Sequence, residues 1–257
     1  MATVAAVALY AGVCVDAFVI EPNWPALRCV EIVGNVSEPV EILHLSDLHI
    51  EEDLPRREVW LLEQLARLEP DLILLTGDTH QAENSDPVSL ARILGEIQAP
   101  LGVYACIGYD NATVVEGVAP QVKHLVNEAV LLEHRGRRIG VAGLMEVGER
   151  APVYDAVQAA DYAIVLNHTP DLADEAVAWG VDLYLCGHTH GGQVRIPFWG
   201  AIITNCDSGK KYEGGWYRNG ATHIHTSRGL GLEPRPAPQV RFFCRPEITL
   251  IRVIPEE

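Results

Sequence analysis

The stretch Cys186-Gly187-His188-Thr189-His190-Gly191-Gly192-Gln193 follows an apolar run, 181–185, that is typical of a buried strand. Two histidines two residues apart on a glycine-flanked turn can point both imidazoles into one cleft, because glycine lets the backbone bend tightly. Histidine is the commonest metal ligand among protein side chains. The stretch therefore predicts a strand end that carries a metal site. The alternative is a polar turn whose histidines face solvent.

Three other apolar runs end in the same residue types: Asp47 and His49 follow 41–45, Asp78 follows 71–75, and His168 follows 162–166. A single aspartate at such a position is often only a cap or a turn former. Four strand ends that carry only Asp and His instead indicate one shared metal site, because the carboxyl edge of an α/β sheet is where such sites are built.

Helix-like and strand-like segments alternate along the chain. Helical spacing covers 55–68 and 88–97, and Thr169 before Pro170 predicts a helix start. Further strands are expected at 101–107, 129–132, 139–144, 222–226 and 248–254. The pattern predicts a layered α/β domain with a mixed sheet over residues 39–257, preceded by an N-terminal apolar segment and lead-in over 1–38.

Charge restricts the partners. A formal net charge of −16 argues against nucleic acid, which needs a clustered basic surface. Residues 207–245 reverse this balance, with the basic residues Lys210, Lys211, Arg218, Arg228, Arg235, Arg241 and Arg245 against the acidic residues Asp207, Glu213 and Glu233. This region is suited to receive an anionic substrate. A solvated charged face explains it equally well.

The first twenty residues and the cysteines bear on location. Residues 3–20 are apolar except for Thr3, Gly12 and Asp16, and no Lys or Arg precedes Arg28. This is compatible with a weak signal anchor, with a helix lying on the membrane through residues 1–20, or with a soluble helix packed on the domain.

The six scattered cysteines lack a C-x-x-C pair and indicate a reducing compartment. We therefore expect the protein at the cytoplasmic face of the membrane or in the cytoplasm.

The motifs Asp47-x-His49, Gly77-Asp78, His168 and Gly187-His188-x-His190 resemble, in order and spacing, the calcineurin-like metallophosphoesterase superfamily over about 41–190. The stretches 18–22, 191–195, 227–231 and 244–249 are similar to its bacterial, membrane-anchored branch. Some members of that branch hydrolyse UDP-diacylglucosamine or related lipid phosphoesters.

The resemblance implies a four-layer α/β/β/α sandwich of mixed sheets that holds two divalent metal ions. It assigns Asp47, His49 and His190 to the first metal, Asp78 to the bridge, and His168 and His188 to the second metal. Mixed imidazole and carboxylate ligands suit Mn, Fe or Zn. Two such ions about 3.5–4 Å apart activate water and clamp phosphoryl oxygens.

One segment departs from the family pattern. Where the family has Gly-Asn-His followed by Asp or Glu, this chain has Gly108-Tyr109-Asp110-Asn111. Tyr109 therefore replaces an amide ligand of the second metal, and Asp110 replaces the histidine that assists the leaving group. Three substitutes stay open: Asn111 as a displaced ligand, Tyr109 as a phenolate ligand, and Asp110 as a catalytic acid.

Several other residues are ambiguous from the sequence. Arg228 is a candidate for binding substrate phosphate, with structural pairing as the alternative. His44 reads as a core histidine and His80 as a neighbour of the ligands, while either His223 or His225 can line the cleft.

We expect a metal-dependent phosphoesterase that hydrolyses a phosphodiester or pyrophosphate, with a phosphorylated small molecule or lipid as substrate. One alternative is a soluble phosphodiesterase for small esters. Another is a degenerate family member that binds metal or a phosphorylated ligand without turnover, for which Tyr109 and Asp110 are the reason.

Overall fold

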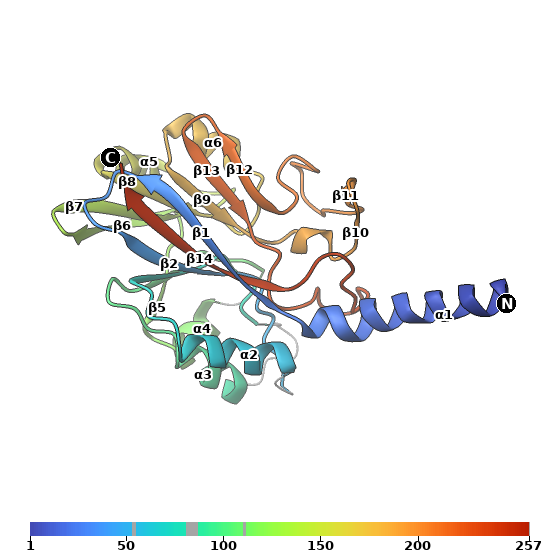
Figure 1. The fold of residues 1–257 in the computed structure, drawn as a ribbon. Helices are drawn as coiled ribbons and strands as arrows, with labels where there is room; N and C mark the ends of the chain where they lie inside the picture. The colour runs from blue at the N-terminus through green and yellow to red at the C-terminus, as the bar shows by residue number, and fades with distance from the viewer. Residues whose placement is uncertain (53–54, 81–86, 110–111, 257) are drawn as a thin grey trace.

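The structure is a computed structural model that describes residues 1–52, 55–80, 87–109 and 112–256. Within these residues, two mixed sheets of six strands each lie at the centre (Figure 1). The first has the order β1 (Ala26–Gly34), β14 (Glu247–Pro255), β2 (Val40–Leu45), β3 (Leu72–Leu75), β4 (Val103–Ala105), β5 (Val122–His124). The second has the order β12 (Gly215–Asn219), β13 (Thr222–Thr226), β9 (Leu183–Cys186), β8 (Tyr162–Leu166), β7 (Arg137–Gly143), β6 (Glu128–His134). A separate small hairpin joins β10 (Arg195–Ile196) to β11 (Gly200–Ala201).

Strand direction brings the loops that carry Asp and His together. In the first sheet β2, β3, β4 and β5 are parallel, and in the second β13, β9, β8 and β7 are parallel. The carboxyl ends of parallel strands meet at one edge of their sheet. The segments after β2, β3, β8 and β9 are therefore neighbours at the sheet edges.

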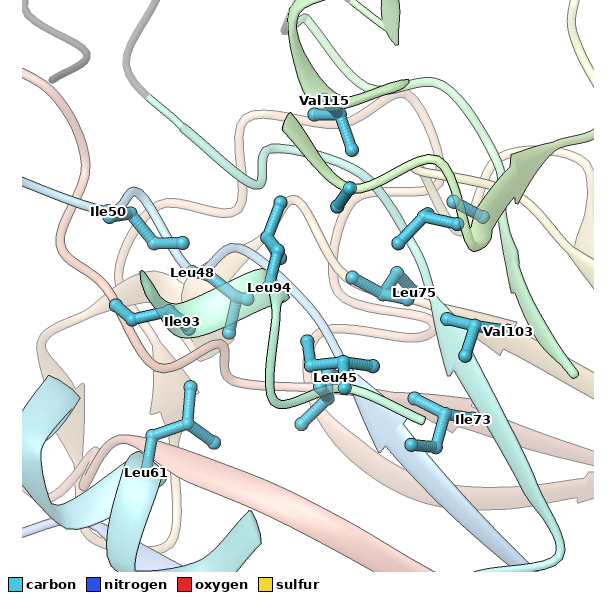
Figure 2. Packing of buried hydrophobic residues seen from close by; sticks show 14 of the residues in the cluster. Leu45, Leu48, Ile50, Leu61, Ile73, Leu75, Ile93, Leu94, Val103 and Val115 are labelled. Carbon is cyan, nitrogen blue, oxygen red and sulfur yellow. The ribbon is translucent and has the colours of Figure 1, made fainter. Parts of the chain in front are cut away.

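Alternation of apolar side chains along the strands divides the core into layers. In β3, Leu72 and Leu74 point into the cluster between the two sheets, while Ile73 and Leu75 point into the cluster under the helices of the first sheet. Figure 2 shows this second cluster, in which Leu61 and Leu94 from the helices meet Ile73 and Leu75 from the sheet.

Helices cover the outer face of each sheet. Those of the first sheet are α2 (Arg56–Leu65), α3 (Pro87–Leu94) and α4 (Ala112–Val118), and those of the second are α5 (Ala151–Ala159) and α6 (Ala173–Trp179). Val153 of α5 and Ala176 of α6 pack with Val165 of β8 in a third apolar cluster. The predicted α/β/β/α sandwich is thus confirmed.

The predicted start of α6 was wrong. The helix begins at Ala173 rather than at Pro170. The reason is local hydrogen bonding, because the Thr169 hydroxyl donates to Glu146 Oε1 and the Thr169 N–H donates to Asn167 Oδ1. Residues 168–172 instead form bends and a turn before the helix begins.

The N-terminal segment is a helix that stands away from the sheets. α1 (Ala2–Val15) continues through a π-helical turn (Asp16–Ile20) and a 3-10 turn (Glu21–Asn23). Within Thr3–Asn23, the most apolar window of 18 residues has a mean hydropathy of 2.1, and only 6% of it is buried. By length and composition this helix can cross a membrane. The structure does not show the alternative of a helix packed on the domain, and α1 projects from one side of the body (Figure 1).

We expect the cluster between the sheets to provide much of the stability. Leu72→Ala removes a fully buried side chain from it and should lower the free energy of unfolding by about 2–5 kcal/mol. Leu131→Ala, at a half-exposed position of β6, is the matched control and should cost about 1 kcal/mol or less. Urea unfolding of both variants of the full chain in mild detergent measures the difference. Equal losses would contradict the layered core.

Candidate metal centre

The six candidate ligands lie on tight turns at the sheet edges, and each is at most 8% exposed. Five have a positive φ, namely Asp47 (47°), His49 (42°), Asp78 (49°), His188 (66°) and His190 (48°). Residues other than glycine seldom adopt this left-handed conformation, and it concentrates at functional sites. The turns after the strands bring the ligand atoms of five candidates close together, and the ring of the sixth, His188, lies beside that of His168.

Asp47, His49 and His190 form the first group of ligand atoms, all within 4.8 Å of one another. The Nε2 atoms of His49 and His190 lie 3.2 Å apart, with the rings stacked. His190 Nε2 lies 3.6 Å from Asp47 Oδ1. Two imidazole nitrogens and one carboxylate converging in this way fit a first-row divalent cation.

Asp47 also belongs to a second group, with Asp78 and His168. Asp78 Oδ2 lies 3.5 Å from His168 Nε2 and 3.7 Å from His49 Nε2, so this carboxylate faces both groups. The Thr76 carbonyl, 2.8 Å from His168 Nδ1, can only accept, which leaves Nε2 of this ring to bind a cation. That Nε2 is buried and makes no hydrogen bond within the described residues.

His188 is adjacent to the second group but is not part of it. Its ring centroid lies 5.0 Å from that of His168. Its Nε2–H donates to the Asn205 carbonyl at 2.8 Å, which leaves Nδ1 as the available ring nitrogen. The predicted role of His188 at the second metal stays a prediction.

Electrostatics also fit a cation at this position. Burial raises the pKa of Asp47 to about 7, because a buried carboxylate loses the hydration of its charge. For Asp78 burial acts in the same direction, but the His168 imidazole, whose Nε2 lies 3.5 Å from Asp78 Oδ2, and the charge of His49 outweigh it and lower the pKa to about 2. Two buried carboxylates this close are costly together unless positive charge lies between them.

A chain of hydrogen bonds holds Asp47 from behind. Ser46 Oγ donates to Asp47 Oδ2 at 2.5 Å, and Thr76 Oγ1 donates to Ser46 Oγ at 2.7 Å. His44 Nε2 lies 2.9 Å from Thr76 Oγ1, and its Nδ1 lies 2.9 Å from Nδ1 of His225 in the other sheet. The prediction of His44 as a core histidine is confirmed. His225 is also buried and orients this chain.

Sequence reasoning counted Arg241 and Glu233 only as part of the charged region 207–245 and did not place them at His190. Arg241 is fully buried and donates to the carbonyls of His190, Arg228 and Gly231, and its NH2 lies 3.2 Å from His190 Nδ1. Glu233 Oε2 lies 3.3 Å from His190 Nε2. Both residues reach His190 only because the chain folds back after β13, and no local pattern signals this.

Tyr109, from the segment that departs from the family pattern, lies over the second group of ligand atoms. The Tyr109 N–H donates to Asp78 Oδ1 at 2.6 Å, and its ring packs against those of His168 and His188. Burial, followed by nearby carboxylates, raises the pKa of Tyr109, which opposes a phenolate in the protein alone. The predicted catalytic Asp110, together with Asn111, lies outside the described residues.

Arg228 pairs with Glu247, as the structural alternative to substrate binding predicted. Its Nε lies 3.9 Å from Glu247 Oε2, and its backbone N–H donates to Glu247 Oε1 at 3.2 Å. Its role in binding substrate stays a prediction.

Glycines make the close approach of the loops possible. A Cβ on Gly187 would lie 1.9 Å from Ser46 Oγ and 2.1 Å from Asp47 Oδ2. A Cβ on Gly231 would lie 2.5 Å from the Leu48 carbonyl oxygen. The ligand loops of the two sheets are therefore in backbone contact.

We expect Gly187→Ala to displace Asp47, because the added methyl group and the carboxylate cannot occupy the same space. Both ligand groups share Asp47, so the metal content of the purified protein should fall at both positions. Gly117→Ala, on an exposed helical turn with nothing within 4 Å of the added Cβ, is the control. Metal analysis by mass spectrometry compares the two variants, and full metal content in Gly187→Ala would contradict the described packing.

Comparison with known proteins agrees with this geometry. Residues 40–192 match the calcineurin-like phosphoesterase family. The uncharacterized metallophosphoesterase YkuE of Bacillus subtilis is 34% identical over 80% of this chain and 74% of its own length. Phosphodiesterase YaeI of Escherichia coli is 30% identical, over 91% and 90%. The UDP-2,3-diacylglucosamine pyrophosphatase LpxG of Chlamydia trachomatis is more distant, at 26% over 92% of both chains. The chain therefore belongs to the calcineurin-like phosphoesterase family, and it is a metallophosphoesterase hydrolase with candidate His and Asp metal sites.

Proposed function

We propose that this metallophosphoesterase is a phosphodiesterase that acts at a membrane surface on a lipid-linked phosphodiester or pyrophosphate. The observation that carries the proposal is the pair of ligand groups that share Asp47, with Asp78 facing both. Two cations in such a site lower the pKa of water and neutralise charge on a phosphoryl group.

The residues of the chain act mainly by positioning. Thr76 and Asn205 fix the ring orientations of His168 and His188 through their carbonyls, and Arg241 fixes the His190 turn. Such partners hold ligands in place before a cation or substrate arrives, so that little reorganisation is needed during the reaction.

The acidic surroundings favour a phosphate that carries one charge. Glu146, Asp171 and Glu233 all contribute, after burial, to the raised pKa of Tyr109 above the second group. The guanidinium groups of Arg228 and Arg241 are directed toward Glu247 and backbone carbonyls. A diester or an internal pyrophosphate carries less charge per phosphorus than a monoester and is repelled less.

The N-terminal helix supports a membrane location. Its most apolar window is almost uncovered by the domain. Arg28 and Arg245 lie at its domain end, where the Arg245 guanidinium stacks 3.9 Å from the centre of the Trp24 ring. Aromatic rings are enriched at both membrane interfaces, and an excess of basic residues at one end of a span is typical of the cytoplasmic side. We therefore propose that the helix is an anchor and that the metal centre faces the cytoplasm.

The names of two relatives also support the proposal. YaeI is called a phosphodiesterase, and LpxG a pyrophosphatase of a diacylated nucleotide sugar. In both substrate classes the phosphorus is substituted on two sides, by two ester oxygens in a phosphodiester and by one ester and one anhydride oxygen in a pyrophosphate.

Hydrolysis of chromogenic esters tests the proposed class. In detergent with added Mn²⁺ or Zn²⁺, the full chain should cleave bis(p-nitrophenyl) phosphate with a kcat/KM about tenfold or more above that for p-nitrophenyl phosphate, a difference of about 1.4 kcal/mol. Asp78→Asn should abolish cleavage of both and lower the metal content, whereas Asp155→Asn, on the exposed face of α5, should change neither. Preference for the monoester would refute the phosphodiesterase assignment.

The segment 108–110 predicts dependence on the leaving group. Because Asp110 stands where the family has a histidine, alkyl diesters should be cleaved more slowly than aryl diesters by about the 10²–10⁴-fold that general acids supply. The double variant Tyr109→Asn/Asp110→His should narrow this ratio and tighten binding of the second metal in titration calorimetry. An equal rate on both esters in the unaltered chain would show that its own residues already replace the histidine.

A further inference from the structure

We propose that the hairpin of residues 195–203 docks into the surface of a lipid bilayer and sets the metal centre against that surface. This hairpin, which we call the aromatic hairpin, comprises β10, β11, the turn between them and the two isoleucines that follow. The inference rests on the membrane anchor of the proposed function and adds a second, independent contact.

The aromatic hairpin exposes large apolar side chains to an unusual degree. Phe198 and Trp199 at its turn are 111% and 67% exposed, and Ile196, Ile202 and Ile203 are each about half exposed or more. Apolar surface exposed to water is unfavourable, and soluble proteins seldom gather such residues in one patch without a partner. The hairpin is therefore built to contact an apolar phase.

Its polar atoms suit a bilayer interface. Lys210 Nζ lies 4.6 Å from the centre of the Trp199 ring and donates to the Trp199 carbonyl at 2.6 Å. Tryptophan and lysine together are typical of the level of the lipid head groups, where the indole is half buried and the ammonium meets phosphate. A protein partner would not require this pairing.

The hairpin lies beside the end of the N-terminal helix. The Arg195 N–H donates to the Phe242 carbonyl at 2.9 Å, and the next residue, Phe243, donates its N–H to Glu21 Oε2 at 2.9 Å. Phe243, itself half exposed, lines one groove of about 330 Å³ with Ile196, Phe198 and Trp199. In Figure 1, β10 and β11 lie on the side of the body from which α1 projects. A bilayer that holds the helix is thus at the level of the hairpin.

The hairpin is also fixed to the metal centre. It begins five residues after His190, and Arg195 NH1 donates to the Gly191 carbonyl at 2.8 Å. The carboxylate of Glu213 accepts from Arg195 NH2 at 2.7 Å and from the Ala201 N–H at 3.1 Å, so it ties both strands together. Docking of the hairpin therefore determines the distance between the ligands and the lipid head groups.

Tryptophan quenching in vesicles tests the docking. The full chain is reconstituted into vesicles of phosphatidylcholine and phosphatidylglycerol whose acyl chains are brominated near the head group, and its emission is compared with that in unbrominated vesicles. If the Trp199 indole lies among the brominated acyl chains, Trp199→Phe should reduce the part of the emission that bromine quenches by the contribution of that one indole. Trp24→Phe should remove a separate share, because Trp24 ends the helix and is 57% exposed. Trp179→Phe is the control, because Trp179 packs on Tyr154 in the outer helix layer of the second sheet.

The outcomes separate the two membrane contacts. If Trp24→Phe lowers the quenched emission and Trp199→Phe does not, the anchor stands and the docking hairpin is refuted. If neither variant changes it, the anchor is refuted as well. If Trp199 is not quenched and Phe198→Glu converts a dimer to a monomer in sedimentation, the hairpin is an interface between two copies of the chain, and the proposal is overturned. Hydrolysis of the chromogenic diester in detergent should be unchanged by Trp199→Phe.

Discussion

The contact on which the site depends is the bond from the His188 backbone N–H to the carboxylate of Asp47. Asp47 follows β2 of the first sheet, and His188 follows β9 of the second. The N–H lies 3.1 Å from both carboxylate oxygens, which is possible only because Gly187 has no side chain. Since both groups of ligand atoms include Asp47, each exists only while the two sheets are joined at this point.

Holding these ligands together has a cost that the rest of the fold offsets. Asp47 is fully buried, and five of the six candidate ligands have left-handed backbone conformations. Such conformations cost of order 1–3 kcal/mol each and persist where the surroundings fix them. The hydrogen-bond chain from Asp47 to His225 and the bonds from Arg241 to the loop carbonyls provide that fixation. The burial of the apolar layers on both sides of each sheet then offsets the free-energy cost of this polar centre.

Three regions that bear on function follow one another in space. The N-terminal helix ends at Asn23, and the Glu21 carboxylate accepts hydrogen bonds from the backbone N–H groups of Phe243 and Cys244. Phe242, the residue before Phe243, pairs with Val194, which leads directly into the aromatic hairpin. The hairpin in turn is tied to the turn of His190 by Arg195. In the proposed arrangement, a lipid-linked phosphate that enters from the bilayer at the hairpin would reach the candidate ligands along this connected path.

The sequence by itself determined the strands that carry the candidate site and the Asp and His residues at their ends. Apolar periodicity located β2, β3, β8 and β9 to within a few residues, because buried parallel strands must be apolar on both faces. It failed for β1, whose charged residues Arg28 and Glu31 are exposed, and for the start of α6, where side-chain bonds of Thr169 replaced a helical cap.

Only the tertiary structure decided how the ligands are held. Arg241, Glu233 and Asn205 reach the site across long sequence separations, and no local pattern encodes such contacts. The same holds for the position of the aromatic hairpin beside the N-terminal helix, because 222 residues separate Glu21 from Phe243. Local chemistry selects strands, turns and ligand types, whereas distances between ligands depend on how two separate sheets pack against each other.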